Sequence, residues 1–261
     1  MYDDVAESPF EVDRGFAGVL WQLPTDGTAR PLVLLGHGGS GHKRSPRQIQ
    51  LAHRLARSGL AVAAIDGPFH GERAGEPLST TAYQQLIVDH GVERVLDGMT
   101  EDWLATISVV GQVAKVRTDR LGYVGMSMAT RFGLPLAAAL GERLSCALLG
   151  KFGLEQSDVL HPGLRTPRRI LSDAMRVVAP VMYHVQWNDE IFPRAGQFAL
   201  FDNLGSTDKR LVAIPGPHTG STDSMLTLWQ LFLTEKLLGA STDESDGAGG
   251  GAGTNRSAVG S

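Results

Sequence analysis

The sequence predicts an α/β fold with a mostly parallel central sheet and helices on both faces. Short continuous apolar runs alternate with longer amphipathic segments through most of the 261 residues. Such runs are typical of strands covered on both faces, and their alternation with helices is typical of parallel sheets. We expect residues 1–240 to form a single domain, a common length for one α/β unit. The Gly-, Ser- and Ala-rich stretch 241–261 is expected to be a disordered tail.

The first predicted elements follow in chain order. Residues 16–22 alternate loosely between apolar and other types, which favours an early antiparallel strand, and the apolar run 31–36 favours a buried strand. Pro46, directly after Ser45, predicts a helix that begins there and is stopped by Gly59. Further buried strands are expected over residues 60–65, 121–125, 145–150 and 180–186, and another strand is expected over residues 210–214.

The other segments are assigned from the spacing of their apolar residues. Residues 72–100 contain Gly, Pro and a Ser-Thr-Thr cluster, so we expect an irregular excursion above the sheet. Residues 151–178 lie between two strands and have room for one or two helices, which predicts a small lid or none. Helices are expected over residues 101–116, 128–140 and 222–238.

Composition and charge limit the classes of function. The net charge of −4 argues against nucleic-acid binding, and the basic stretch 42–44 with Arg47 is interpreted as solvated surface. No run approaches the ~20 apolar residues that span a bilayer, and the acidic N-terminus is unlike a signal peptide. The single cysteine, Cys146, is expected to be a buried thiol. We therefore expect a cytoplasmic protein with a small-molecule substrate and neither nucleic-acid nor membrane partner; the oligomeric state stays open.

A serine lies at a predicted strand-to-helix junction. Ser127 stands in the motif Gly-Met-Ser-Met-Ala (125–129), directly after one predicted strand and before a predicted helix. A tight turn of this kind exposes the serine hydroxyl above the sheet and needs small neighbours, because the backbone passes close by. Ala129 departs from the usual Gly-x-Ser-x-Gly pattern but is still small. The start of the helix also favours an anionic intermediate. The motif predicts Ser127 as a nucleophile.

Two further polar residues follow later strands along the chain. Asp189 comes just after the predicted strand 180–186, and His218 lies in a Pro- and Gly-rich loop after the next one. A stiff loop restrains a general base through its backbone. Ser, Asp and His therefore follow three separate strands in the order that serine hydrolases of this architecture use. We interpret Asp189 as the carboxylate that orients His218, with Glu190 as the neighbouring alternative.

Several stretches together resemble the α/β-hydrolase superfamily. They are residues 36–39, residues 66–73, residues 125–129, Asp189 and His218. Within the superfamily, the chain is similar to compact esterases and peptidases around the dienelactone hydrolase and prolyl oligopeptidase groups. The resemblance extends through about residues 15–240 and implies the α/β-hydrolase fold. It also implies a serine hydrolase that needs no cofactor.

The glycine-rich turn after the first buried strand resembles an oxyanion loop. Glycines let a backbone N–H point at a substrate oxygen without obstruction. We expect the N–H groups of Gly39 and Met128 to be the oxyanion donors, with Gly38 as second choice, and His37 to be structural. No dense His and Asp spacing typical of zinc proteases is present, so no metal is expected. The candidate pocket residues are Gly38, Phe69, His70, Trp187 and Phe192.

These residues predict hydrolysis of an ester bond in a small or medium-sized substrate, through an acyl-enzyme on Ser127. The absence of a large predicted lid favours such a substrate over long-chain lipids. Thioesterases, peptidases, acyltransferases, lyase-like biosynthetic enzymes and cofactor-free haloperoxidases or perhydrolases share this machinery, so the sequence leaves them open. A non-catalytic binding protein is the least favoured alternative, because the serine, aspartate and histidine are all present.

Overall fold

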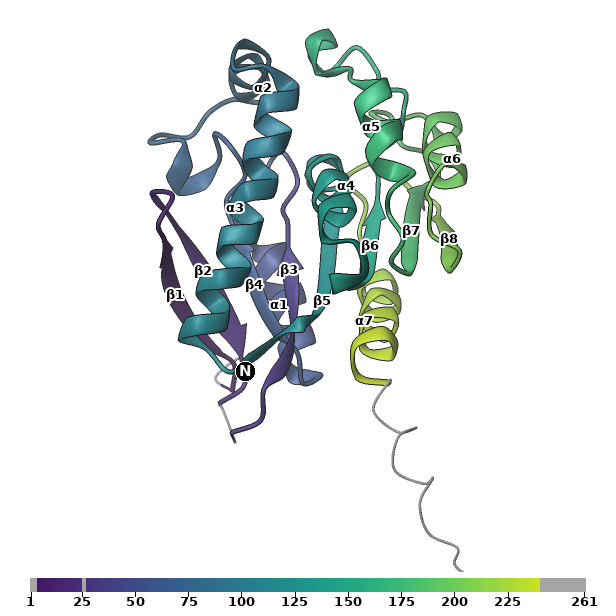
Figure 1. The fold of residues 1–261 in the computed structure, drawn as a ribbon. Helices are drawn as coiled ribbons and strands as arrows, with labels where there is room; N and C mark the ends of the chain where they lie inside the picture. The colour runs from purple at the N-terminus through teal and green to yellow at the C-terminus, as the bar shows by residue number, and fades with distance from the viewer. Residues whose placement is uncertain (1–3, 25–26, 240–261) are drawn as a thin grey trace, which may run out of the picture.

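The computed structural model describes residues 4–24 and 27–239, and an eight-stranded sheet lies at its centre (Figure 1). The strands are β1 (Ala6–Val12), β2 (Phe16–Gln22), β3 (Arg30–Leu35), β4 (Ala61–Ile65), β5 (Val116–Met126), β6 (Leu144–Gly150), β7 (Val181–Gln186) and β8 (Lys209–Ile214). Their order across the sheet is β1-β2-β4-β3-β5-β6-β7-β8. Strand β2 pairs antiparallel with β1 and β4, and every other neighbouring pair is parallel.

Helices cover both faces of this sheet (Figure 1). The α-helices are α1 (Pro46–Arg57), α2 (Thr80–Asp89), α3 (Val92–Val113), α4 (Met128–Leu140), α5 (Pro167–Ala174), α6 (Arg194–Asp202) and α7 (Asp223–Leu238). The 3-10 turns are η1 (Gly71–Arg73), η2 (Gly141–Arg143) and η3 (Pro162–Leu164). Successive side chains of a strand point to opposite faces. Leu32 and Leu34 of β3 therefore pack with α2 to α6, whereas Val33 and Leu35 pack with α1 and α7. The predicted fold class is confirmed.

Most predicted elements are present with similar bounds. Strand β2 and helix α4 have the predicted bounds, and α1 and α7 differ from them by one residue at one end. Strand β5 begins at Val116, earlier than expected. Its first part lacks the apolar signal of a buried strand, because residues 117–120 are polar and none of residues 116–120 is buried. The predicted buried thiol is confirmed, since Cys146 is fully buried within β6.

The expected irregular excursion over residues 72–100 is wrong for most of its length. It contains α2 and the first part of α3, which begins at Val92. Val92, Leu96, Met99 and Trp103 recur at helical spacing and are buried, so packing sustains the helix there. Strand β1 and helix α6 were also not expected; most side chains of β1 are exposed, which removes the apolar signal of a strand.

Two expectations about the chain ends have no structural outcome. The assignment of residues 1–240 to a single domain stays a prediction, and the predicted tail 241–261 lies outside the described residues. Within the described ranges, every helix is too short or too polar to cross a bilayer.

Candidate active site

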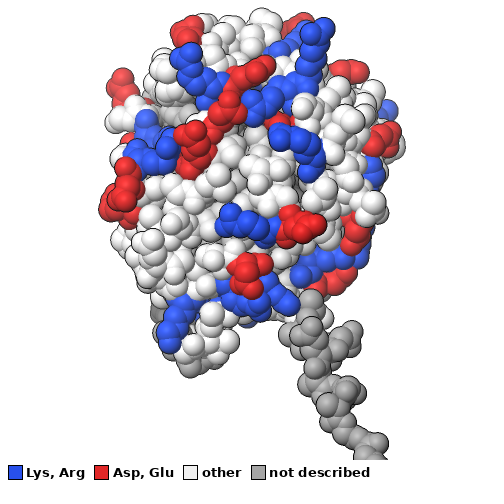
Figure 2. All heavy atoms as spheres, in the orientation of Figure 1, with Lys and Arg blue, Asp and Glu red and all other residues white. Residues whose placement is uncertain are grey.

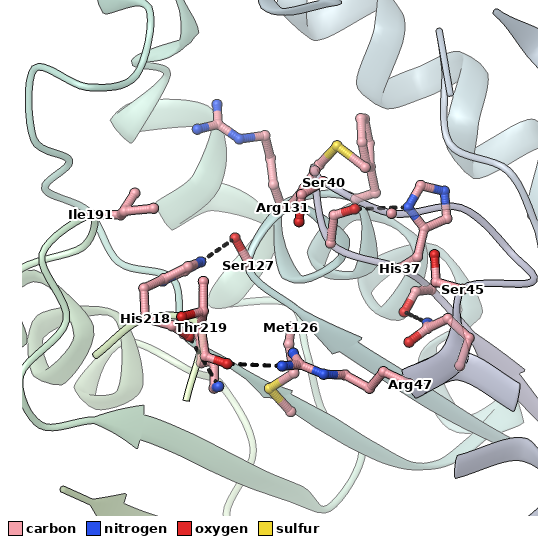
Figure 3. Close-up of a pocket in the computed structure, with 18 of the residues that line it drawn as sticks. His37, Ser40, Ser45, Arg47, Met126, Ser127, Arg131, Ile191, His218 and Thr219 are labelled. Atoms are coloured by element: carbon pink, nitrogen blue, oxygen red, sulfur yellow. Dashed lines mark hydrogen bonds between the residues drawn. The ribbon is translucent and has the colours of Figure 1, made fainter. Parts of the chain in front are cut away.

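The three residues predicted to act together meet at the carboxyl edge of the parallel strands. Ser127 follows β5, Asp189 follows β7 and His218 follows β8. His218 Nε2 lies 2.9 Å from Ser127 Oγ, and His218 Nδ1 lies 2.8 Å from Asp189 Oδ2. Figure 3 shows the imidazole of His218 directed at Ser127. With the proton on Nδ1, the histidine donates to the carboxylate and accepts from the serine hydroxyl. The loops after separate strands thus assemble one hydrogen-bonded chain.

Ser127 occupies a strained turn between β5 and α4. Its backbone angles (φ 60°, ψ −120°) are rare for any residue but glycine, and such strain concentrates at functional sites. The turn is braced from β6, because Ser127 N–H donates to Gly150 O at 2.9 Å and Gly150 N–H donates to Thr130 Oγ1 at 2.9 Å. A Cβ on Gly125 would lie 2.6 Å from Ala129 O, so glycine is needed there. This is the close backbone approach expected from the motif.

Asp189 is held by donors other than the histidine. Its Oδ1 accepts the backbone N–H groups of Ile191 at 2.9 Å and Phe192 at 2.8 Å, and its side chain is fully buried. Gln197 Nε2 lies 3.3 Å from Oδ2. Two backbone donors on Oδ1 leave Oδ2 aimed at the imidazole. The alternative carboxylate, Glu190, instead accepts the backbone N–H of the histidine at 2.8 Å and does not reach its ring.

The loop that presents His218 is held by two basic residues from other parts of the chain. Lys151, directly after β6, donates from Nζ to His218 O at 3.1 Å and to Gly220 O. Arg47 of α1 donates from Nη2 to Thr219 O at 2.8 Å (Figure 3). Lys151 is buried, and desolvation together with the nearby charge of Arg47 lowers its pKa to about 8. These contacts restrain the loop in addition to the stiffness of its Pro and Gly residues.

The glycine-rich turn after β3 lies beside the start of α4, as its predicted role requires. His37 Nε2 accepts the N–H of Gly67 at 2.8 Å, and its Nδ1 lies 2.9 Å from Gly38 O. Burial lowers the pKa of His37 to about 4, which keeps the ring neutral and structural. A Cβ on Gly39 would lie 2.2 Å from Tyr83 Oη. Among the described residues, no acceptor is found for the N–H of Gly39 or Met128.

A cavity of about 490 Å³ opens beside Ser127 and His218 (Figure 3). Gly38, Gly39, Met128 and Phe192 line it, as do Ser127 and His218. The apolar part of its wall comes from several elements, among them α2, α4 and the segments after β6 and β7. Those apolar wall residues include Ile87, Phe132, Leu160, Leu164 and Ile191.

Three predicted pocket residues do not line this cavity. Phe69 packs with its ring 5.0 Å from that of His90. His70 lies behind the glycine-rich turn, with Nε2 3.0 Å from Gly39 O, and supports the turn instead of facing substrate. Trp187 points outward, is 43% exposed, and stacks under the guanidinium of Arg194 at 4.4 Å. Proximity to a motif in sequence did not determine the direction of these side chains.

The basic stretch 42–44, interpreted above as solvated surface, contains a buried residue. Lys43 is 2% exposed; its Nζ lies 2.6 Å from Asp66 Oδ2 and 2.8 Å from Glu72 Oε2. Burial opposes the charged form of Asp66, but hydrogen bonds from Lys43 and from the Glu72 N–H hold its pKa below the ordinary value. The pair ties the loop after β3 to the loop after β4. Within the described ranges, no group of three or more His, Cys, Asp or Glu side chains is placed to hold a metal.

Sequence reasoning missed several residues of the site. Tyr83, Arg131 and Lys151 line the cavity, and none of them belongs to a recognisable motif. Arg131 follows Ser127 by one helical turn, a spacing that placed it beside the nucleophile. Lys151 follows a predicted strand end, the position at which the other site residues were found, and this signal was available.

Comparisons with known proteins place these observations in context. No protein-family model and no curated protein matches the chain. Among solved structures, the chain is similar to a cold-adapted esterase from an Arctic intertidal metagenomic library, with a TM-score of 0.76 and 32% identity over 90% of this chain and 95% of that chain. It is also similar in fold to an acetyl xylan esterase from Paenibacillus sp. R4, with a TM-score of 0.68 and 18% identity over 89% of this chain and 84% of that one. A monoacylglycerol lipase from Paleococcus ferrophilus has a TM-score of 0.62 and 17% identity over 89% and 99%.

Proposed function

We propose that this chain, which belongs to the α/β-hydrolase superfamily, hydrolyses the ester bond of a small or medium-sized substrate through an acyl-enzyme on Ser127. Membership in the superfamily follows from the 32% identity to a solved esterase over 95% of that chain. The observation that supports the proposed mechanism best is the pair of hydrogen bonds that joins Asp189, His218 and Ser127, at 2.8 and 2.9 Å. That chain of contacts is what an activated serine requires.

The first half of the proposed reaction forms the acyl-enzyme. Ser127 Oγ attacks the ester carbonyl while His218 Nε2 takes its proton, and Asp189 stabilises the imidazolium. The carbonyl oxygen becomes an oxyanion, which accepts hydrogen bonds from the N–H groups of Gly39 and Met128. The C–O bond to the alcohol then breaks, and His218 returns the proton to the leaving oxygen.

The second half releases the acid. A water molecule gives a proton to His218 Nε2 and attacks the acyl carbonyl, so the same two N–H groups stabilise a second oxyanion. The bond to Ser127 Oγ breaks, His218 returns the proton to the serine, and the free carboxylic acid leaves. Every step uses side chains and backbone groups of this chain with water, and the enzyme returns to its starting state.

The dimensions of the cavity support a substrate of modest size. A volume of about 490 Å³ is typical of sites for small molecules, and its apolar walls suit the hydrocarbon part of an ester. The segment after β6 contributes only the short turn η3 and helix α5 above the sheet, so the serine stays accessible. Thioesters would react by the same route, and the test below therefore includes them.

The proposal is tested by a substrate panel. Turnover of p-nitrophenyl esters from acetate to dodecanoate is measured beside a thioester and an anilide of matched acyl length. We expect the short and medium esters to react fastest, and Ser127→Ala to lower kcat by about 10⁴- to 10⁶-fold. Ser108→Ala, on the exposed side of α3, is the matched control and retains full activity. Faster turnover of the thioester or the anilide, or no turnover by the folded wild type, would overturn the proposal.

A further inference from the structure

The cavity beside Ser127 is lined by basic side chains and by no carboxylate. Arg47, Arg131 and Lys151 line it, whereas none of its lining residues is Asp or Glu. Within the described residues, the acceptors found for these three side chains are uncharged oxygens. Elsewhere, basic and acidic side chains adjoin one another, as Figure 2 shows on one face and as the 2.7 Å contact of Arg210 with Glu235 illustrates. The side chains that line the cavity thus carry a net positive charge in a chain whose net charge is −4, and the carboxylates that act on Lys151, those of Asp189 and Glu190, do not line it.

Two of the three cations are engaged in holding the loop of His218. Arg47 donates to Thr219 O, and Lys151 donates to His218 O and Gly220 O. These carbonyls are dipoles and do not neutralise a charge. Both side chains therefore add positive potential at one end of the cavity, while their hydrogen-bonding groups face the loop.

Arg131 is the cation best placed to meet a ligand. It lies on α4, is 6% exposed, and donates to Leu164 O and, at 3.2 Å, to Gln156 Oε1. A guanidinium has five N–H groups, so donors remain beyond those two contacts. Burial lowers its pKa to about 10, and no carboxylate of the described residues lies near enough to offset that cost. A buried charge without a counter-ion destabilises the folded chain, and a bound anion would offset this desolvation cost.

Arg131 and the nucleophile line the same cavity from the start of one helix. The backbone N–H of Arg131 donates to Ser127 O at 3.3 Å, so the two residues are one turn apart on α4, a rise of about 6 Å. Figure 3 shows the guanidinium of Arg131 on the opposite side of Ser127 from Arg47 and Thr219. The planar guanidinium fork matches a carboxylate with two parallel hydrogen bonds.

We propose that the natural substrate is an ester that also bears a free carboxylate, and that Arg131 binds this carboxylate while the ester carbonyl lies against Ser127. Half-esters of short dicarboxylic acids have this chemistry. The inference rests on the proposed ester hydrolysis and adds the class of substrate. Arg131 is then a specificity-determining residue, and Arg47 and Lys151 supply supporting positive potential.

The test compares monoethyl succinate, glutarate and adipate with neutral ethyl esters of equal chain length. We expect wild-type kcat/KM to favour the best half-ester by tenfold or more, and less at high salt, because screening weakens charge pairing. In Arg131→Gln that preference falls tenfold or more, and Arg131→Lys recovers part of it. Arg168→Gln, at an exposed position of α5, retains the wild-type preference. Equal losses on charged and neutral esters would mean that Arg131 only supports the segment that contains Leu164, and would overturn the inference.

A second measurement does not depend on turnover. Calorimetry on Ser127→Ala measures the binding of monoethyl glutarate and of its neutral diester, with and without Arg131→Gln. Tighter binding of the half-ester that is lost in the double variant supports the inference. If both ligands bind alike, the carboxylate site is refuted even where wild-type esterase activity is present. If half-ester binding depends on Arg131 while no ester is hydrolysed, the proposed function fails and the anion site stands.

Discussion

Replacing Asp189 by Asn should move the proton of the His218 ring from Nδ1 to Nε2 without unfolding the chain. Oδ1 accepts the N–H groups of Ile191 at 2.9 Å and Phe192 at 2.8 Å, so the amide oxygen of Asn must take that place. The amide NH2 then takes the place of Oδ2, 2.8 Å from His218 Nδ1. Because an NH2 group only donates, Nδ1 must accept and the proton moves to Nε2. Nε2 then has no lone pair for the proton of Ser127.

The expected loss follows from the removal of the general base. We expect kcat to fall by about 10⁴-fold, the loss typical of a wrong histidine tautomer. At 1.36 kcal/mol for each tenfold change, this corresponds to about 5 kcal/mol of transition-state stabilisation. The two backbone hydrogen bonds to the side chain at position 189 are retained, so the circular dichroism spectrum should be unchanged.

The neighbouring carboxylate provides the matched control. Glu190 accepts the backbone N–H of His218 at 2.8 Å, and the amide oxygen of Gln can accept the same bond. Glu190→Gln should therefore retain kcat within about threefold on the ester that reacts fastest. The reasoning is refuted if Asp189→Asn stays within tenfold of wild type, or if Glu190→Gln shows the larger loss.

Three further predictions concern the loops around the serine. Gly39→Ala places a Cβ 2.2 Å from Tyr83 Oη, which displaces the turn, and steady-state kinetics should show a loss of about 10²-fold in kcat; an unchanged kcat would exclude this N–H as a donor. Burial lowers the pKa of His37 from 6.5 to about 4, so the unfolded chain binds the extra proton first and stability falls as pH falls through that interval. Urea midpoints at pH 7.0, 5.5 and 4.5 should fall more steeply for wild type than for His37→Gln, and parallel curves would contradict this. Lys43→Met leaves the buried carboxylate of Asp66 without its cation and should lower the free energy of unfolding by about 3–5 kcal/mol, whereas a urea-denaturation loss below about 1 kcal/mol would contradict the pairing.

The three residues of the proposed triad could be predicted because topology alone brings them together. Ser127, Asp189 and His218 each follow a parallel strand, and the carboxyl ends of parallel strands meet at one edge of a sheet. The strained turn at Ser127 is also visible in the local sequence, because its neighbours must be small. Where the position of a residue depends on the order of the strands along the chain, the sequence was sufficient to predict it.

The direction and the pairing of side chains were harder to predict from the sequence. Trp187 directly follows β7 but turns outward to Arg194, because nothing in a strand-end position specifies a rotamer. Lys43 stands in a basic run that indicates solvated surface, yet its partner Asp66 lies 23 residues away and draws it inside. Arg131 has the sequence context of an ordinary helical residue. The charge of the cavity depends on which side chains from distant elements converge, and that convergence appears only in three dimensions.

The most direct test of the central claim is the intact mass of the chain after incubation with a fluorophosphonate probe, in wild type and in Ser127→Ala. A nucleophile activated by His218 should give a single adduct in wild type, with labelling lost in Ser127→Ala and retained in Ser108→Ala. That result would establish Ser127 as an activated nucleophile. A folded wild type that is not labelled, or an adduct that persists in Ser127→Ala, would contradict the proposed mechanism.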